Sequence, residues 1–468
     1  MTQTTTAVYP GAGTTDEAID ADGEVRPAYV ELLDEVTRRV PERLAARVAG
    51  HVEAAGARFG GEDGWPFHVD PVPRLLAREE WEQLTRGLVQ RTAALEAFVA
   101  DVHGPRRALA AGAVPEHVVS GSPFLEPDLL DGAVPLPPRI AVAGIDVVRD
   151  ADGRLRVLED NCRTPSGIAF ALAAREAIAA HVGVPDEVAD LREATRRALP
   201  EALESLRPPG EDDGAIVLLT DGPSNTAHFE HRVLAELAGL PLVEPGDLVA
   251  RDDRLLLRED GRPIAVLYRR TDVDRLRDGE GRPTAIGELV LPALRAGTLA
   301  VANGFGCGVA DDKATYPHVD ALIRFFLDEE PLLPAVPTLH LADPAALEEA
   351  LERLDQLVLK PRDGLGGHGV VLGPEADAEE LRDVRALILE DPAAWLAQEP
   401  VSLSTHPTVV DGRLAPRHVD LRPFVLRRRD GGRAVLPGGL TRVALAAGER
   451  VVNSSRGGGG KDTWVVAR

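Results

Sequence analysis

A glycine-rich segment beside a lysine is the first feature of this sequence that could do chemistry. Residues 358–372 read VLKPRDGLGGHGVVL, and the apolar runs predict one strand ending at Lys360 and another beginning at Val370. Glycine backbone can approach a ligand closely and point its N–H groups at phosphate oxygens, while the lysine adds a point charge for the same phosphates. The loop glycines are Gly364, Gly366, Gly367 and Gly369. The spacing fits neither a P-loop nor a dinucleotide fingerprint, and the competing interpretation is an ordinary hairpin with a flexible turn.

A set of oxygen-bearing side chains lies far upstream, on a second predicted hairpin. Two apolar runs, residues 140–148 and 155–158, are separated by the turn sequence Asp-Ala-Asp-Gly. Glu159 and Asn161 are two residues apart on one strand and therefore share a face, which Asp146 on the partner strand can join. Two carboxylates and one amide oxygen suit Mg²⁺ that bridges phosphates. The competing interpretation is a solvated polar face near a turn.

Three shorter patterns carry further polar candidates. Lys313 belongs to an Asp-Asp-Lys-Ala-Thr sequence that predicts the start of a helix, where a lysine is ordinarily solvated. An acid at the end of the strand around residue 398 could accept hydrogen bonds from an adenine amino group or a ribose. Four glycines before Lys461 predict a mobile basic loop. The residues that these patterns and their surroundings contribute are Arg163, Lys313, Gln398, Glu399, Arg422, Arg442 and Lys461.

Lysine is rare in this sequence, so the positions at which it occurs are informative about function. Three of the 52 basic residues are lysines (Lys313, Lys360 and Lys461) and the other 49 are arginines. Two of the three lysines already lie in the motifs described above, and the third follows a second glycine-rich run. The alternative interpretation is that any single lysine is a surface residue that is present by chance and has no functional role.

Length and charge narrow the class of protein. The 468 residues are enough for two or three domains with a sizeable core. A net charge of -24 repels phosphate backbones and anionic lipid heads, which argues against nucleic acid or a membrane as a partner. There is no apolar run of about eighteen residues and no basic, apolar leader pattern near residue 1. Two cysteines cannot make a disulfide scaffold, so a cytoplasmic location is expected.

The elements that must position these residues follow from periodicity. Apolar residues at helical spacing predict helices over residues 28–51, 79–102 and 169–206. A Pro-Pro-Gly-Glu-Asp-Asp-Gly linker begins at residue 208, and a buried strand over 215–219 follows it. A loop, a helix and another strand near residue 241 complete a βαβ unit, for which a Rossmann-like fold is a fold-level expectation.

The order of the motifs resembles the ATP-grasp fold. An Asp-Lys-x-x-Thr sequence, a strand with Lys-Pro, a glycine loop, a Gln-Glu hinge and paired arginines follow one another, but the Asp…Glu-x-Asn set precedes them instead of following. That displaced order is similar to the circularly permuted ATP-grasp type 2 family, which is related to glutathionylspermidine-synthase-like ligases. Two segments carry the likeness most specifically: residues 159–167 (EDNCRTPSG) and 453–464 (NSSRGGGGKDTW). The likeness covers roughly residues 65 to 468.

The resemblance implies a fold class and a division of the chain. The fold class is α/β (α+β), a circularly permuted ATP-grasp fold with a Rossmann-like pre-ATP-grasp domain and a helical N-terminal region. The expected division, in chain order, is a disordered tail (1–25), a helical region plus the permuted metal-binding half (26–207), the Rossmann-like domain (208–310), and the half with the lysines and the glycine loop (311–468).

The resemblance also implies roles for the candidate residues. Lys313, Lys360 and the loop with Gly364, Gly366, Gly367 and Gly369 would bind the phosphates of ATP, and Gln398 and Glu399 would mark the adenine–ribose hinge. Asp146, Glu159 and Asn161 would hold Mg²⁺. Arg163, Arg422 and Arg442 would neutralise the substrate carboxylate and the phosphate passing to it. Beyond the resemblance, we infer from the basic and mobile character of Lys461 and its glycines that they would cover the acyl-phosphate.

The implied reaction is the joining of a carboxylate to an amine. The carboxylate attacks the γ-phosphate of ATP to give an acyl-phosphate and ADP, and the amine then displaces phosphate to form an amide. Amino acids, peptides, polyamines and a protein terminus all remain open as substrates, and so does the oligomeric state. The alternatives are a non-catalytic nucleotide-binding regulatory protein and a carboxylate phosphotransferase that makes no amide.

Overall fold

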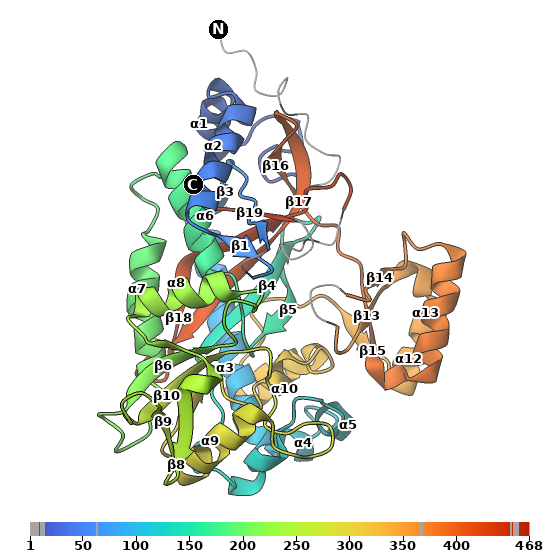
Figure 1. Ribbon diagram of the computed structural model, residues 1–468. Coiled ribbons are helices and arrows are strands. Elements are labelled where there is room, and N and C mark those ends of the chain that lie inside the picture. Colours follow the sequence, from blue (N-terminus) through green and yellow to red (C-terminus); the bar gives the residue numbers. More distant parts are fainter. Residues whose placement is uncertain are drawn as a thin grey trace.

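A six-stranded sheet forms the centre of the molecule (Figure 1). The computed structural model describes residues 9, 15–61, 64–364, 368–449, 452 and 458–467. The strands of the central sheet are β4 (Val142–Arg149), β5 (Leu155–Asn161), β16 (Thr405–Val410), β17 (Arg413–Arg427), β18 (Arg433–Val443) and β19 (Gly459–Lys461). Their order is β19-β18-β17-β4-β5, with β16 paired to β17. The predicted hairpin is confirmed as β4 and β5, and its partner β17 comes from the distant C-terminal part of the chain.

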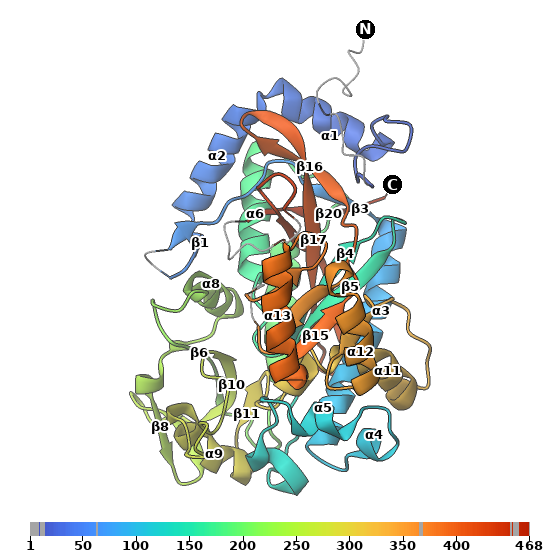
Figure 2. The ribbon, with the colours of Figure 1, turned by 90° about the vertical axis from the view of Figure 1, so that its right-hand side faces the viewer.

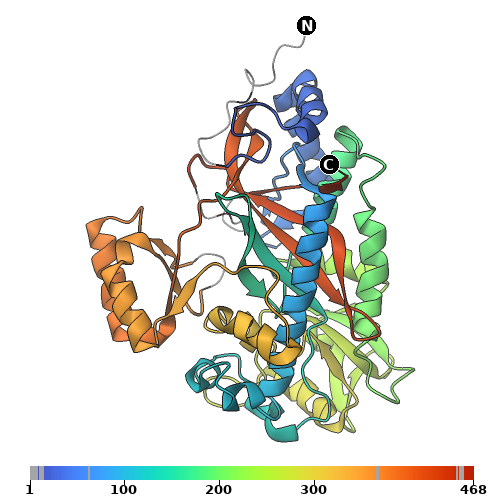
Figure 3. The same cartoon turned by 180° about the vertical axis from the view of Figure 1, so that it is seen from behind.

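Helices cover this sheet, and α3 is the longest of those that the structure describes. It spans Arg78–Val102, as the spacing predicts, and runs across the back of the sheet (Figure 3). The other helices that pack on or near the sheet are α1 (Pro27–Arg38), α2 (Pro41–Ala54), α4 (Arg107–Ala110), α5 (Glu116–Ser120), α6 (Ile168–His181), α7 (Leu191–Glu204), α10 (Gly308–Asp311) and α11 (Val319–Leu327). None of the helices in the described ranges is both long and apolar enough to cross a membrane.

The N-terminal segment differs from the expectation in two respects. The single helix predicted over residues 28–51 is two helices, because Pro41 starts α2 and the residue before it, Val40, leaves the helical region with a φ of 62°. Part of the tail predicted to be disordered up to residue 25 is packed: residues 16–19 are buried, whereas residues 21–24 are exposed. Asp16 and Glu17 are buried, and the Glu17 carboxylate forms a two-bond ion pair with Arg74. Short-range composition does not reveal such a distant partner.

A second sheet belongs to the middle of the chain. Its four parallel strands, in the order β11-β10-β6-β7, are β6 (Ala215–Thr220), β7 (Leu242–Val243), β10 (Ile264–Arg270) and β11 (Ala300–Ala302). The helices α8 (His228–Ala238) and α9 (Ala285–Ala296) and the hairpin β8 (Leu248–Arg251) and β9 (Arg254–Leu257) complete this unit. The predicted βαβ arrangement of β6, α8 and β7 is confirmed. Whether this unit follows the Rossmann pattern beyond that stays a prediction.

A small third unit projects from the side of the molecule and is called the lid here (Figures 1 and 2). Its strands are β12 (Thr338–His340), β13 (Val358–Pro361), β14 (Val371–Leu372) and β15 (Trp395–Gln398), and its helices are α12 (Pro344–Glu352) and α13 (Ala378–Glu390). The strand order is β12-β15-β13-β14, and all three pairings are antiparallel. The strand predicted to end at Lys360 is confirmed as β13. Two small pairings complete the described strands: β1 (Arg58–Phe59) with β2 (Trp65–Pro66), and β3 (Arg74–Ala77) with β20 (Thr463–Val466).

One buried asparagine joins the middle unit to the central sheet. The Asn303 side chain accepts hydrogen bonds from the N–H groups of Ala141 and Val142, and it donates to the carbonyl oxygens of Val142 and Cys162. It is 1% exposed. The amide therefore ties the chain just after β11 to the start of β4 and the end of β5.

We expect the Asn303→Ala variant to be destabilised by about 3 kcal/mol, because four buried backbone groups lose a partner at once. Urea unfolding followed by circular dichroism measures this difference. Ser224→Ala, at an exposed loop position, is the control and should change stability by less than about 0.5 kcal/mol. An Asn303→Ala variant as stable as that control would contradict the prediction.

Candidate active site

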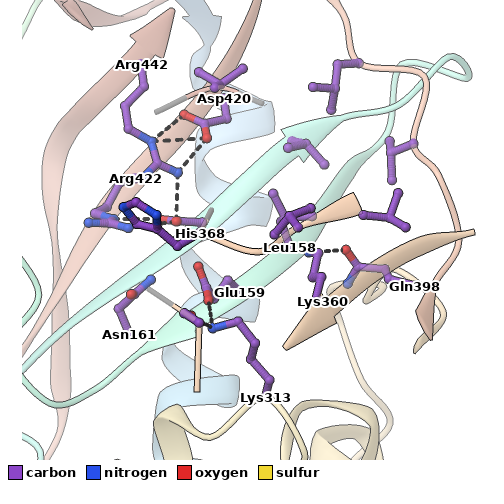
Figure 4. Close-up of a pocket in the computed structure, with 18 of the residues that line it drawn as sticks. Leu158, Glu159, Asn161, Lys313, Lys360, His368, Gln398, Asp420, Arg422 and Arg442 are labelled. Carbon is purple, nitrogen blue, oxygen red and sulfur yellow. Dashed lines mark hydrogen bonds and ion pairs between the residues drawn. The ribbon is translucent and has the colours of Figure 1, made fainter. Parts of the chain in front are cut away.

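A cleft of about 570 Å³ lies between the lid, the β4–β5 hairpin and strands β17 and β18. Most of the candidate residues line it (Figure 4). The structure brings together Asp146, Glu159, Asn161, Lys313, Lys360, Gly364, Gln398, Glu399, Arg422 and Arg442. They come from five separate stretches of the chain (146–161, 313, 360–364, 398–399 and 422–442), so the tertiary fold creates their proximity.

The three oxygen-bearing side chains of the β4–β5 hairpin lie on one face, as side-chain alternation along its strands predicts. Asp146 pairs directly with Glu159 across the hairpin, and Asn161 pairs with Gly144. Directly opposed residues of an antiparallel pair point to the same face. Asp146, Glu159 and Asn161 therefore share the face that lines the cleft.

Two lysines from different elements approach the hairpin (Figure 4). The Lys313 Nζ lies 2.9 Å from Glu159 Oε1 and donates a hydrogen bond of 2.7 Å to the Gly364 carbonyl. The Lys360 Nζ donates to Gln398 Oε1 at 2.5 Å. Lys313 follows the short helix α10 instead of opening a helix as predicted, because the chain turns after Asp311. Figure 4 shows both lysines near Glu159.

Burial and charge shift the pKa values of these groups. Burial lowers the pKa of Lys360 to about 8, although the Glu159 carboxylate opposes that change. For Glu159, burial favours the neutral acid, but the positive charge of Lys313 outweighs it and the pKa lies below its ordinary value. Lys360 is therefore the group of this pair whose charge changes at moderately alkaline pH.

A buried ionic network forms the wall of the cleft next to the hairpin. Asp146 accepts from Arg422 Nε at 2.5 Å and from Arg442 at 2.7 Å, and Arg442 also pairs with Asp420. Despite burial, the two guanidiniums lower the pKa of Asp146 to about 2. Burial raises the pKa of Asp420, which has one principal cation, Arg442. Sequence reasoning missed Asp420, although it lies two residues before Arg422 on one strand and shares its face.

The lid supplies a glycine turn and an apolar slot. Gly364 and Gly369 lie at the turn between β13 and β14, and Gly369 has a φ of +72°. Gly366 and Gly367 lie outside the described residues. Gln398 is buried at the end of β15, whereas Glu399 is paired with Arg353. The apolar residues that line this end of the cleft are Val148, Leu158, Val358, Val370, Leu372, Val401, Leu403 and Val452. Single apolar residues on strands resemble core, so sequence reasoning did not identify this slot.

Arg163 and Lys461 are not brought into the cleft. Arg163 pairs with Asp274 and Asp311, and its guanidinium lies over the Phe124 ring. Lys461 was expected on a mobile loop but lies in β19, where it is fully buried and paired with Asp70. The structure therefore does not bring Lys461 to the cleft, and its expected role over an acyl-phosphate stays a prediction. The polar glycine-rich sequence before it gave no sign of Asp70, which is distant in the chain.

The hairpin set fits a hard divalent cation by its donor chemistry. Glu159 and Asn161 offer carboxylate and amide oxygens, and the Asn161 Nδ2 is buried with no hydrogen-bond partner among the described residues. Asp146 already shares its oxygens with Arg422 and Arg442. Over the part of the chain that the structure describes, no three His, Cys, Asp or Glu side chains form a metal-binding group. A cation here would therefore depend on the amide oxygen as a ligand.

We expect the Lys360 ammonium to titrate near pH 8, about two units below a free lysine. Because the chain has three lysines, NMR on protein labelled with ¹³C-lysine can follow each side chain separately. The Glu159→Gln variant should lower this midpoint further, since a negative neighbour that favours the ammonium is removed. The exposed Glu82→Gln should leave it unchanged. A Lys360 midpoint above pH 10 would contradict the prediction.

Comparison with known proteins places this cleft in a family. The chain matches the sequence model described as "Circularly permuted ATP-grasp type 2" over residues 73–444. It is 45% identical to a Frankia alni protein named "Putative glutamate--cysteine ligase 2-3", over 97% of this chain and 54% of that relative. It is 38% identical to an uncharacterised Synechocystis protein, over 96% of each chain. The chain thus spans about half of the ligase-named relative.

A solved structure agrees at the level of the fold. The glutathione synthetase-like effector of Globodera pallida aligns with a TM-score of 0.57 at 12% identity, covering 91% of this chain and 98% of that one. At this identity the likeness concerns the fold alone. With the family match over residues 73–444, it leads to one conclusion: the chain belongs to the circularly permuted ATP-grasp type 2 family.

Proposed function

We propose that the protein is an ATP-dependent ligase that joins a carboxylate to an amine through an acyl-phosphate, releasing ADP and phosphate. One observation carries the proposal: a single cleft combines two lysines, a carboxylate–amide set and a pair of arginines. A reaction that gathers phosphates and a carboxylate needs such a concentration of cations and hard oxygen ligands. Membership of an ATP-grasp family supports the nucleotide, and the ligase name of the Frankia relative supports the reaction class.

We assign the lid end of the cleft to ATP. The apolar slot has the character needed by an adenine ring, and Gln398 at the end of β15 offers amide groups at its edge. Lys360 and Lys313 lie deeper, where they would pair with phosphate oxygens. The carbonyl of Gly364 accepts from Lys313, which places the start of the glycine turn beside that ammonium. A bound polyphosphate would compete for both lysines with Glu159 and Gln398.

We assign the hairpin to Mg²⁺. Glu159 and Asn161, with Asp146, would hold the ion, which would supply charge neutralisation between phosphates. Lys313 now neutralises Glu159, so the carboxylate is held in place and ionised before any cation arrives. The Asp146 carboxylate is likewise kept ionised by its two arginines. The chain's own contribution is thus a preorganised anionic face.

The arginine pair would receive the substrate carboxylate. Arg422 and Arg442 carry more donors than Asp146 and Asp420 use, since a guanidinium has five N–H groups. A carboxylate oxygen of the substrate would attack the γ-phosphorus, and the bond between that phosphorus and the β–γ bridging oxygen would break to release ADP. The amine nitrogen would then attack the acyl carbon, lose a proton and expel phosphate. Each step forms one bond and breaks one.

The observations that support the reaction class do not identify the individual substrates. The name of the Frankia relative mentions glutamate and cysteine, but that protein is about twice as long as the region this chain matches. We therefore keep amino acids, peptides and other small carboxylates and amines as the substrate class.

We expect ADP release to require both a carboxylate and an amine, and Lys360→Met and Glu159→Gln each to lower its rate by about 100-fold or more. A coupled ADP assay over pairs of amino acids and peptides measures this. Arg382→Met and Glu82→Gln, at exposed positions outside the cleft, are the matched controls and should retain the rate. Turnover with a carboxylate alone would favour a phosphotransferase, and ATP binding without turnover would favour a regulatory protein.

We expect affinity for a non-hydrolysable ATP analogue to weaken as pH rises through about 8. Lys360 has a lowered pKa in the free protein, so above that pH the analogue meets a neutral amine and must take up a proton to regain the ion pair. Isothermal titration calorimetry between about pH 7.5 and 9.5 measures the dependence. The Lys360→Arg variant keeps its charge and should show a flatter profile. Parallel profiles for the two proteins would contradict the role of Lys360.

A further inference from the structure

A second cavity, of about 220 Å³, lies away from the cleft, between the middle unit and the central sheet. Its apolar wall includes Leu129, Leu206, Leu299, Val301 and Phe305. A cavity of about 150 Å³ with such a lining accepts a benzene ring. This one is therefore large enough for a ring or a short alkyl chain. The candidate residues of the cleft do not line it.

Cationic groups gather at one side of this cavity around a single acid. Arg139 and Arg427 line it, and both reach Glu96 Oε1, at 3.4 and 2.5 Å. Arg433 approaches Oε2 of the same glutamate at 3.3 Å. In the described part of the chain these three arginines form no other ion pair. Three positive charges thus share one negative charge, which Glu96 holds at 5% side-chain exposure.

Two of these three arginines, Arg427 and Arg433, are held close together by strands β17 and β18. Arg427 and Arg433 are directly opposed across β17 and β18, an arrangement in which like charges repel. The Nε atoms of both are buried, and neither has a hydrogen-bond partner among the described residues. Their side chains are only 15% and 8% exposed. Buried cationic donors without partners are costly, and an anion beside Arg427, which lines the cavity, would offset part of that cost.

We propose that this cavity binds an organic anion with an apolar body, of which a medium-chain or aromatic carboxylate is the simplest form. The body would occupy the apolar wall formed by Leu206, Leu299 and Val301. The carboxylate would lie against Arg139 and Arg427, which have donors beyond those used by Glu96. The site is separate from the cleft, so the proposal does not depend on the proposed ligase activity.

Calorimetry on the full chain with octanoate as the probe tests this site. Octanoate should bind, whereas octylamine, which has the same chain and a positive head, and acetate, which has no apolar body, should bind at least about tenfold more weakly. Absence of octanoate binding, or equal binding of octylamine, would overturn the proposal.

Two variants and one control locate the binding. Arg139→Gln removes one cation while Glu96 keeps two, and Val301→Phe fills the apolar space; each should weaken octanoate binding by about tenfold or more. Arg106→Gln is the matched control, because Arg106 has a similar exposure (39% against 41%) and a similarly long ion pair, at 3.9 Å to Asp131. Melting curves establish that each variant is folded. Octanoate affinity unchanged in both cavity variants would place the binding elsewhere and overturn the proposal.

Discussion

The ionic network of Asp146, Arg422 and Arg442 is the interaction on which the arrangement of the cleft depends. Its members are 276 and 296 residues apart in the chain, and they join β4 to β17 and β18. Removing one partner of a buried pair leaves an uncompensated charge and costs about 3–5 kcal/mol. Apolar side chains of similar size would stabilise the same sheet, so stability alone does not account for charges here. What the charges add is a set of ionised groups at the wall of the cleft.

The position of the lid depends on a second set of polar contacts at its base. Arg362, two residues after Lys360, forms a buried two-bond pair with Asp312, the residue before Lys313. Lys313 in turn reaches the Gly364 carbonyl of the lid. Each lysine of the cleft therefore lies within two residues of one that anchors the lid to the body. The two ammonium groups can keep a fixed separation even where the far side of the lid, with α13, lies away from the central sheet (Figure 1).

Local pattern was enough to predict the parts of the site that one element carries by itself. Asp146, Glu159 and Asn161 were predicted to share a face because side chains alternate along the two strands of a hairpin. The structure confirms this, since Asp146 lies opposite Glu159. The strand that ends near Lys360 follows from its apolar run and the glycines after it. Contacts between distant segments could not be read in this way: Asp420 beside Arg442, or Asp70 beneath Lys461. Those pairings depend on how sheets assemble, and an isolated carboxylate in the sequence does not show which cation it will meet.

Two of the three lysines, Lys461 and Lys313, have surroundings of the same kind. Lys461 points a compact ammonium at three acceptors at once: the Asp70 carboxylate and the carbonyls of Val72 and Pro407. A planar guanidinium, with its donors spread across a fork, does not fit such a convergent set of oxygens. Lys313, between the Glu159 carboxylate and the Gly364 carbonyl, has the same kind of surroundings.

Arginine serves elsewhere in this chain, where two parallel bonds to one carboxylate are possible, as between Arg91 and Asp160. At Lys313 and Lys461, lysine therefore stands where acceptors converge on one point. Phosphate oxygens create that situation, but so does a buried strand, and accordingly Lys313 and Lys360 line the cleft whereas Lys461 lies outside it. Lysine and arginine also differ in pKa. A buried lysine ammonium can lose its proton, in line with the lowered pKa of Lys360, whereas a guanidinium remains charged.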